Sequence, residues 1–262
     1  MIASVLTELR ATSPLVHCLT NTVVPQITAN VLLAVGAAPA MVDLPEEAEI
    51  FAGIAQAVLI NVGNGSAAQH EAQRRAAAAA HGAGVPWVLD PVAVGALPVR
   101  TALARELLGH SPACVRGNAS EILGLTGRSA GGRGVDATDP VEAALEAARE
   151  LAQQQGCVVA ISGETDLVVS PDRVTRVHGG HALMPLVIGT GCSLGATVAA
   201  ALGAATSRPH EAVVAAHALF AAAGIVAGRS AQAPASFEVA WRDALYTLTP
   251  DEVAELARIE EA

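Results

Sequence analysis

The sequence contains no lysine, and all 15 of its Lys and Arg positions are arginines. A Walker-type phosphate-binding loop needs a lysine at the β- and γ-phosphates, and a Schiff-base enzyme needs a lysine amine. The absence of lysine therefore excludes both classes. Any phosphate chemistry in this chain must use arginine, backbone N–H groups, helix N-termini or a metal ion.

Aromatic residues are also scarce, at 2% of the 262 residues, and the formal net charge is −10 at pH 7. Proteins that bind nucleic acids need positive charge for the phosphates and aromatic side chains on which bases stack. We therefore expect no nucleic-acid partner. Hydrophobic residues make up 52% and charged residues 15% of the chain, a composition typical of a folded protein with an aliphatic core.

The four cysteines form neither a CxxC pair nor a zinc-ligand spacing. The N-terminal residues MIASVLTELR lack a basic start followed by an apolar run, so no signal peptide is expected. The longest apolar stretch, residues 212–228, contains His217 and falls just short of a membrane span, which favours a buried helix. We expect a cytoplasmic protein with reduced thiols and no membrane contact.

Short apolar runs alternate with longer helical patterns in the first half of the chain. The runs lack polar alternation, as do strands of a parallel sheet that is covered on both faces. The expected strands are 15–19, 39–42, 57–62, 87–90 and 113–116, and the expected helices are 22–35, 46–55, 66–81 and 99–108. Repeated β-α units of this kind predict a three-layer α/β/α sandwich with a mostly parallel central sheet.

The pattern changes after residue 156. Three runs at 157–162, 166–169 and 173–177 follow one another closely and predict an antiparallel meander at one edge of the sheet. From Gly191 onward the chain is almost entirely helical, with helices at 191–205, 209–227 and 235–245. The glycine-rich segment 127–139 is expected to be a loop or lid. Without an internal repeat or a long linker, the chain 1–262 is predicted to be a single domain.

Polar residues follow most of the predicted strands, at the carboxyl edge where α/β sheets bind ligands. They are Thr20-Asn21, Asp43, Asn64, Asp90, Gly117-Asn118 with Glu121, and Gly163-Glu164. Asp90 and Glu121 would place two carboxylates on one rim, which suits Mg²⁺. Alternatively, Asp90 caps the next element and Glu121 is a solvated acid in the first turn of a helix that starts at Asn118. The pattern leaves both interpretations open.

The segment from Ile188 to Gly195 (IGTGCSLG) precedes a long alanine-rich helix. Its small residues permit close approach to the backbone, and the N–H groups of a helix start attract anions such as a phosphoryl group in transfer. Cys192 would lie in the first turn, where we expect its pKa to fall so that the thiolate accepts a proton from a substrate hydroxyl. The alternative is a small buried cysteine between helix and sheet.

Residues 63–68 (GNGSAA) match a dinucleotide-binding fingerprint, with Asp90 at the end of the next strand. However, two β-α units precede this motif, whereas the fingerprint usually opens its domain. The turn at Pro91 would also point the Asp90 side chain in a different direction from that of the acidic residue in the fingerprint. The pair His178 and His181 is interpreted as part of a strand-end loop rather than as a metal site. His17 and His217 lie in apolar runs and are interpreted as hydrogen-bonded core residues.

A set of motifs along most of the chain resembles a known family. They are HCLTN (17–21), TAN (28–30), PAMV (39–42), VLDPVAVGA (88–96), VRGNASEI (115–122), ISGETD (161–166) and GTGCSLGA (189–196). Together they resemble the hydroxyethylthiazole kinase family of the ribokinase-like superfamily, over residues 5 to 255. The resemblance implies a ribokinase-like fold and the phosphorylation of 4-methyl-5-(2-hydroxyethyl)thiazole by ATP and Mg²⁺, in thiamine biosynthesis or salvage.

The resemblance also implies roles for particular residues. ATP would contact Arg116, Asn118 and Ser162, the last at a position where the family usually has threonine. The thiazole would contact Asn21, Met41 and Gly189, and Asp90 and Glu121 would organise Mg²⁺. Cys192, with Gly189 and Gly191 beside it, would stand where most superfamily members carry a catalytic aspartate. Family members are homotrimers with sites at subunit interfaces, which implies the same assembly here.

Three alternatives stay open at this point. The first is a kinase of the same superfamily that acts on a hydroxymethylpyrimidine. The second is an NAD-type oxidoreductase built on Gly63, Gly65 and Ala68. The third is a non-catalytic module that binds a nucleotide through Asp90, Glu121 and Gly191.

Overall fold

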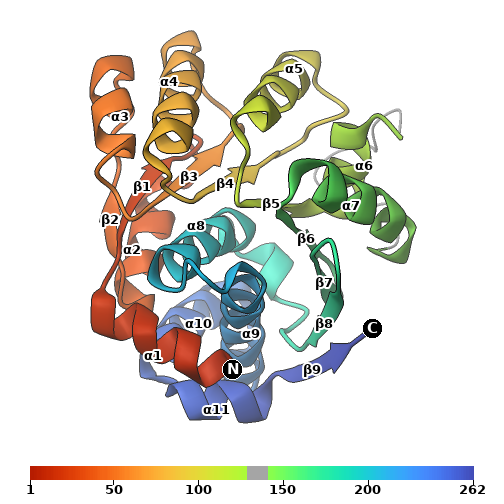
Figure 1. Cartoon of the computed structure of the whole chain (residues 1–262). Coiled ribbons are helices and arrows are strands. Elements are labelled where there is room, and N and C mark those ends of the chain that lie inside the picture. Colours follow the sequence, from red (N-terminus) through yellow and green to blue (C-terminus); the bar gives the residue numbers. More distant parts are fainter. Residues whose placement is uncertain (129–140) are drawn as a thin grey trace.

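A single central sheet organises the computed structural model, which describes residues 1–128 and 141–262 (Figure 1). Within these residues the sheet has nine strands in the order β2-β1-β3-β4-β5-β6-β7-β8-β9. The strands are β1 (Leu15–Leu19), β2 (Ala38–Ala40), β3 (Ala57–Asn61), β4 (Trp87–Asp90), β5 (Cys114–Asn118), β6 (Val158–Ser162), β7 (Thr165–Val169), β8 (Val174–His178) and β9 (Arg258–Glu261).

The strands from β2 to β6 are parallel, whereas β6, β7, β8 and β9 pair antiparallel. The predicted mostly parallel sheet with an antiparallel meander is therefore confirmed. The C-terminal part is almost entirely helical, as predicted, but β9 was not predicted: it pairs with β8 and forms the edge of the sheet beyond the meander. Its residues RIEE are largely exposed, and a short charged edge strand carries no apolar run that sequence patterns could detect.

Helices cover both faces of the sheet and complete the predicted three layers (Figure 1). On one face lie α3 (Pro45–Ala52), α4 (Ala67–Ala83), α5 (Pro98–Leu107), α6 (Ala119–Thr126) and α7 (Val141–Gln155). On the other face lie α1 (Ile2–Thr12), α2 (Pro25–Val35), α8 (Thr190–Ala204), α9 (Pro209–Gly228), α10 (Pro234–Thr247) and α11 (Pro250–Leu256). Each face has its own cluster of buried hydrophobic residues.

Prolines decide where several helices begin. The helix predicted to start at residue 22 is α2, which starts at Pro25. Proline fits the first helical turn, and it disfavours helical backbone in the residue before it, so the helix cannot extend backward through Val24. The helices predicted from residues 46 and 99 likewise begin one residue earlier, at Pro45 and Pro98. Of the predicted loop 127–139, the part from residue 129 lies outside the described residues.

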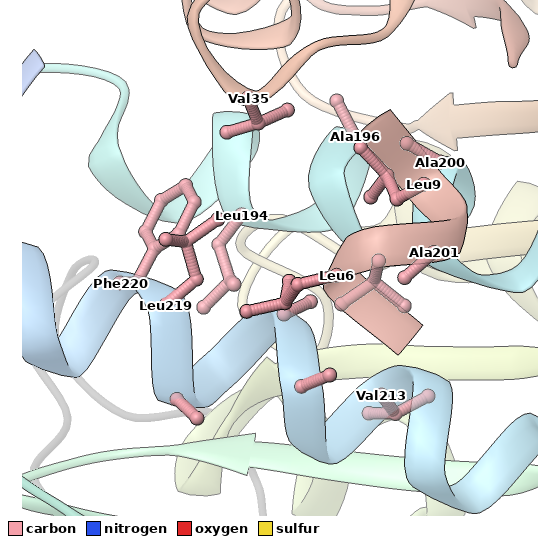
Figure 2. Packing of buried hydrophobic residues seen from close by; sticks show 14 of the residues in the cluster. Leu6, Leu9, Val35, Leu194, Ala196, Ala200, Ala201, Val213, Leu219 and Phe220 are labelled. Atoms are coloured by element: carbon pink, nitrogen blue, oxygen red, sulfur yellow. The ribbon is translucent and has the colours of Figure 1, made fainter. Parts of the chain in front are cut away.

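The contact between α1, α8 and α9 forms much of one core (Figure 2). Leucines such as Leu6 and Leu9 of α1 pack beside alanines such as Ala196 and Ala200 of α8, and these small residues let the helices approach closely. Among the described residues, α9 is the one helix long and apolar enough to cross a membrane, but 78% of its most apolar window is buried inside the protein. The interpretation of residues 212–228 as a buried helix is confirmed.

The position of α8 brings the site together. This helix packs against β1, β3 and β4. Since those strands are parallel neighbours, their carboxyl ends lie at the same edge of the sheet, where the polar residues of the sequence motifs follow.

Candidate functional site

Two neighbouring strands end in polar side chains that bond directly to each other. Asn61 and Asp90 are the last residues of β3 and β4 and are paired in register. Asn61 Nδ2 donates a hydrogen bond to Asp90 Oδ2 at 2.7 Å. Both residues are buried. A buried carboxylate thus stands at the carboxyl edge with a neutral donor beside it.

This pair extends into a chain of polar side chains that reaches α8. Asn21, which follows β1, donates from Nδ2 to Asn61 Oδ1 at 3.0 Å and to Cys192 Sγ at 3.5 Å. The structure therefore brings together Asn21, Asp90 and Cys192, as the sequence predicted. Asn61 links them and was not predicted, because the strand was expected to continue to residue 62 and Asn64 was singled out after it.

Asp90 has the environment expected of a cation ligand. Burial raises the pKa of this carboxyl to about 7, although Arg116 acts in the opposite direction. The Oδ1 atom is buried and has no hydrogen-bond partner among the described residues. A buried carboxylate oxygen without a partner is costly unless a ligand fills the place.

Glu121 interacts electrostatically with Asp90, and burial raises the pKa of Glu121 as well. The alternative that it is a solvated acid is wrong, because the side chain is buried. Its Oε2 accepts the N–H of Asn118 at 2.8 Å, and its Oε1 accepts the N–H of Ala93 at 2.9 Å. It therefore closes a capping box at the start of α6 and also orients the loop that follows β4.

The two buried carboxylates fit a divalent cation that keeps part of its own water shell. The described residues contain no group of three or more His, Cys, Asp and Glu side chains able to hold a metal ion. Mg²⁺ suits such a place, since it is commonly bound by one or two carboxylates together with waters and substrate phosphates.

Cys192 lies in the first turn of α8, which begins at Thr190 after Gly189. The expectation that its pKa is lowered is wrong: burial raises the pKa of Cys192 to about 12, and the charge of Asp90 acts in the same direction. The hydrogen bond with Asn61, the charge of Arg116 and the hydrogen bond from Asn21 favour the thiolate, but the loss of hydration outweighs them. At neutral pH this environment favours the thiol.

A cavity of about 600 Å³ opens beside this cluster and is lined by residues of several elements. Arg116 of β5 and Ser162 of β6 lie on one wall, and Arg116 Nη2 donates to Ser162 Oγ at 2.5 Å. Thr190 and Gly191 line the cavity at the start of α8, next to Cys192. Farther along, the lining is more apolar and includes Val177, Ala182, Met184, Pro185, Phe220 and Ala221. Glu164, Asp166 and His181 line the cavity as well. An arginine and a helix start at one end, with apolar side chains farther along, suit a nucleotide.

Gly189 and Met41, which the family resemblance assigns to the second substrate, have different surroundings. Gly189 has a left-handed backbone with φ +85°, and a Cβ there would lie 2.5 Å from Ile27 Cγ2. Its small size is therefore required by the packing of α2 against the start of α8. Met41 follows β2, the edge strand opposite β9, and is 37% exposed. The backbone beside it is held by His17, whose Nε2 lies 2.7 Å from Val42 O.

Three further polar candidates form hydrogen bonds of their own. Asn118 is the N-cap of α6, with Oδ1 accepting from Glu121 N at 2.9 Å. Asp43 is exposed and accepts from Gln69 Nε2 at 3.2 Å. Asn64 Oδ1 accepts from Arg100 Nη2 at 3.0 Å.

The glycine motif 63–68 has a packing explanation. A Cβ at Gly63 would lie 2.7 Å from Asn21 Cβ, so this glycine is required by the neighbouring side chain rather than by a dinucleotide. His178 ends β8 and lies 3.3 Å from Glu260, whereas the ring of His181 stacks on that of Phe237. The interpretation of this pair as a strand-end segment rather than a metal site agrees with those separate contacts.

Comparison with known proteins identifies the family. The sequence profile of the hydroxyethylthiazole kinase family matches residues 6–251. The chain belongs to this family. The hydroxyethylthiazole kinase of Corynebacterium glutamicum is 56% identical over 98% of this chain and 97% of its own length. The enzyme of that name from Klebsiella pneumoniae is 57% identical over 91% of this chain and 92% of its own length.

Solved structures agree with the family assignment. A hydroxyethylthiazole kinase protein from Pyrococcus horikoshii has a TM-score of 0.91 and 34% identity, over 100% of this chain and 98% of that one. Pyridoxal kinase from Staphylococcus aureus has a TM-score of 0.63 at 18% identity, over 95% of this chain and 98% of that one, which shows a shared fold alone. The predicted family and ribokinase-like fold are confirmed, and the chain is a kinase. This family membership contradicts the oxidoreductase alternative.

Proposed function

We propose that this chain transfers the γ-phosphoryl group of ATP to the hydroxyethyl group of 4-methyl-5-(2-hydroxyethyl)thiazole, in thiamine biosynthesis or salvage. The observation that carries the proposal is the hydrogen-bonded chain from Asp90 through Asn61 and Asn21 to Cys192. This chain ends at the start of α8, where the N-terminal residues also line the nucleotide-sized cavity. The names of the close relatives support the thiazole as acceptor.

In the proposed reaction, the hydroxyethyl oxygen forms a bond to the γ-phosphorus while the bond to the β–γ bridging oxygen breaks. ADP leaves with that electron pair, and the hydroxyl proton passes to a phosphoryl oxygen or to solvent. The transition state spreads charge over the γ-phosphoryl oxygens, so positioning and electrostatic stabilisation supply most of the catalysis.

We assign the nucleotide to the cavity of about 600 Å³, where the lining residues Arg116 and Ser162 would contact it. Asn118, the N-cap of α6, follows Arg116 by two residues and is assigned as a further contact from the family resemblance. Arg116 also lies close enough to Asp90 and Glu121 to affect the pKa of both carboxyls. Its guanidinium can therefore face the triphosphate from one side, while the N–H groups of Gly191 and its neighbours at the helix start face it from another. This arrangement compensates for the absence of lysine.

Asp90 and Glu121 are the residues that would hold Mg²⁺. When bound, the ion would neutralise charge on the β- and γ-phosphates. The unpartnered Asp90 Oδ1 supports a direct or water-mediated ligand role. The oxygens of Glu121 already accept backbone N–H groups, so that carboxylate would contribute mainly through its charge and through bound water.

We place the thiazole near Asn21, Met41 and Gly189. Asn21 and Gly189 flank Cys192, and Met41 offers a soft sulfur to an aromatic ring. Met41 is partly exposed, and Leu44, which follows it closely in the chain, is exposed as well; uncovered apolar side chains in this segment support a homotrimer in which a second subunit completes the pocket. A cytoplasmic location fits the four free cysteines.

Cys192 acts in this proposal as a neutral group that orients the acceptor. Its raised pKa favours the thiol, and Asn21 holds the sulfur in place. The sulfur can accept the hydroxyl proton of the substrate in a weak hydrogen bond, while Gly189 and Gly191 leave room for the approach to phosphorus. The glycines at this helix start therefore let the substrate hydroxyl approach the phosphorus and also leave backbone N–H groups open to an anion.

The test is release of ADP from Mg-ATP with three parallel acceptor conditions: hydroxyethylthiazole, a hydroxymethylpyrimidine, and no acceptor. We expect turnover with the thiazole alone. Turnover with the pyrimidine alone would replace the substrate while keeping the kinase. Absence of turnover in folded protein, together with an ATP-dependent rise in melting temperature, would favour the non-catalytic binding module.

A further inference from the structure

Asn61 uses every hydrogen-bonding group of its side chain within the site. It is fully buried at the end of β3, between β1 and β4 in the sheet. Its Nδ2 donates to Asp90 Oδ2 at 2.7 Å, and its Oδ1 accepts from Asn21 Nδ2 and from Gly63 N, each at 3.0 Å. The amide is therefore a donor toward the carboxylate and an acceptor toward the residue that holds Cys192.

We propose that Asn61 is a positioning residue for phosphoryl transfer, coupling the orientation of Asp90 to that of Asn21 and Cys192. This inference rests on the proposed kinase reaction of the same site. Asn61 acts on Cys192 directly, as a side-chain hydrogen-bond partner that lowers the pKa of the thiol. A second connection runs through the Asn21 amide.

Backbone donors fix which way both amides point. Gly63 N–H donates to Asn61 Oδ1, so the NH₂ group of Asn61 must face Asp90. Val23 N–H donates to Asn21 Oδ1 at 3.0 Å, so the NH₂ group of Asn21 must face Asn61 and Cys192. A flipped amide at either place would bring two donors or two acceptors together. Hydrogen-bond donation thus runs outward from Asn21, to the Cys192 sulfur on one side and through the Asn61 amide to Asp90 on the other.

This direction leaves one oxygen of Asp90 available. Because Asn61 occupies Oδ2, the unpartnered Oδ1 is the atom left for a ligand of the reaction. An aspartate at position 61 would set two buried carboxylates against each other, and an apolar residue would free both Asp90 and Asn21. Either change would allow Asp90, Asn21 and Cys192 to move from their positions, and a displacement of about 1 Å can lower a rate about 100-fold.

Gln73 provides a matched control, because it bonds to the backbone of Asn61 rather than to its side chain. Its Nε2 donates to the backbone oxygen of Asn61 at 2.9 Å, so it supports the strand end without touching the amide. Its own Oε1 is buried without a hydrogen-bond partner among the described residues. Gln73→Leu therefore removes a buried bond at Asn61 but leaves the links to Asp90 and Asn21 in place.

The experiment compares Asn61→Asp, Asn61→Leu and Gln73→Leu with the unmodified chain. We expect both Asn61 variants to lower kcat about 100-fold while the KM for ATP changes less than about threefold. Gln73→Leu should keep kcat within about threefold. Melting temperatures confirm that each variant is folded. If a folded Asn61 variant keeps kcat, or if Gln73→Leu loses as much as the Asn61 variants, Asn61 has only a structural role.

A second measurement separates this inference from the proposed substrate. Cys192 is the one cysteine of the four that is not buried, so alkylation by iodoacetamide under native conditions reports on it. Without Asn61 the Asn21 amide loses its support, and we expect the alkylation rate to change at least about threefold in both Asn61 variants but not in Gln73→Leu. A changed alkylation rate in a chain that turns over no thiazole would overturn the proposed substrate alone. An unchanged rate in both variants would overturn the coupling.

Discussion

His217 of α9 and Asp166 of β7 form a part-buried hydrogen bond at the cavity that we assign to the nucleotide, with 2.7 Å between Nδ1 and Oδ2. Asp166 lines the cavity, and its Oδ1 accepts the N–H of Gly163 at 2.9 Å. The carboxylate therefore joins a core helix to the turn between β6 and β7, next to Ser162. The buried His217 is thereby connected to a wall of the cavity that we propose for ATP.

We predict that His217→Leu raises the KM for ATP several-fold with a smaller effect on kcat. Leucine removes the hydrogen bond to Asp166, and a hydrogen bond to a charged group contributes about 1.5–3 kcal/mol. His217→Asn is the matched variant, because its amide nitrogen can reach the place of Nδ1. Steady-state kinetics at varied ATP check both. Equal KM values for the Leu and Asn variants would show that the bond does not matter for ATP binding.

We predict that Gly191→Ala weakens ATP binding without destabilising the protein. A Cβ at this position would lie 3.1 Å from Arg116 Nη1, so the guanidinium must shift. In contrast, alanine stabilises a helix by about 1 kcal/mol relative to glycine. The measurements are the Kd for ATP and the melting temperature. Gly82→Ala is the control, since a Cβ there meets nothing within 4 Å and lies in α4.

Cys192→Ala should lower kcat about 100-fold or more while the Kd for ATP stays nearly unchanged. The thiol lies beside the nucleotide cavity and is held by Asn21, so its removal takes away an orienting group but no wall of that cavity. Single-turnover kinetics and a nucleotide titration test the two halves of this expectation. Equal losses in kcat and ATP affinity would contradict the assigned role.

Acid should destabilise the fold partly through His210. Burial lowers the pKa of this side chain from 6.5 to about 4, and Arg173 acts in the same direction. The ring lies against Ser170 Oγ, and its Nε2 is 2.8 Å from Thr175 Oγ1. The unfolded chain binds the proton more readily than the folded one, so the free energy of unfolding falls as the pH drops from 6.5 to 4.

His210→Gln removes this titrating group and should flatten that part of the pH profile. Urea denaturation of both chains at several pH values between 4 and 7 measures the difference, and subtraction of the two profiles cancels the shared carboxyl titrations. The same slope in both chains would show that His210 does not contribute. His17 and His70, whose pKa values are also lowered by burial, remain in both chains and are common to the comparison.

The strands were the part of the fold most readily predicted. β1 and β4 have the predicted bounds, and β3 differs by one residue, because strands buried on both faces appear as continuous apolar runs. That one residue matters for the site. Ending β3 at Asn61 pairs its side chain with Asp90, whereas the longer predicted strand drew attention to Asn64. Strand register is decided by pairing across the sheet, which a single segment of sequence does not contain.

The sequence by itself determined the family, the order of β-α units and most residues that meet in the site, because these depend on local patterns and recognisable motifs. Tertiary structure decided how those residues act on one another. Burial against the sheet raises the pKa of Cys192 where the helix start alone predicted a fall. It also places Asn61 between Asp90 and Asn21. Desolvation and hydrogen-bond direction depend on neighbours distant in the chain, and only folding brings these together.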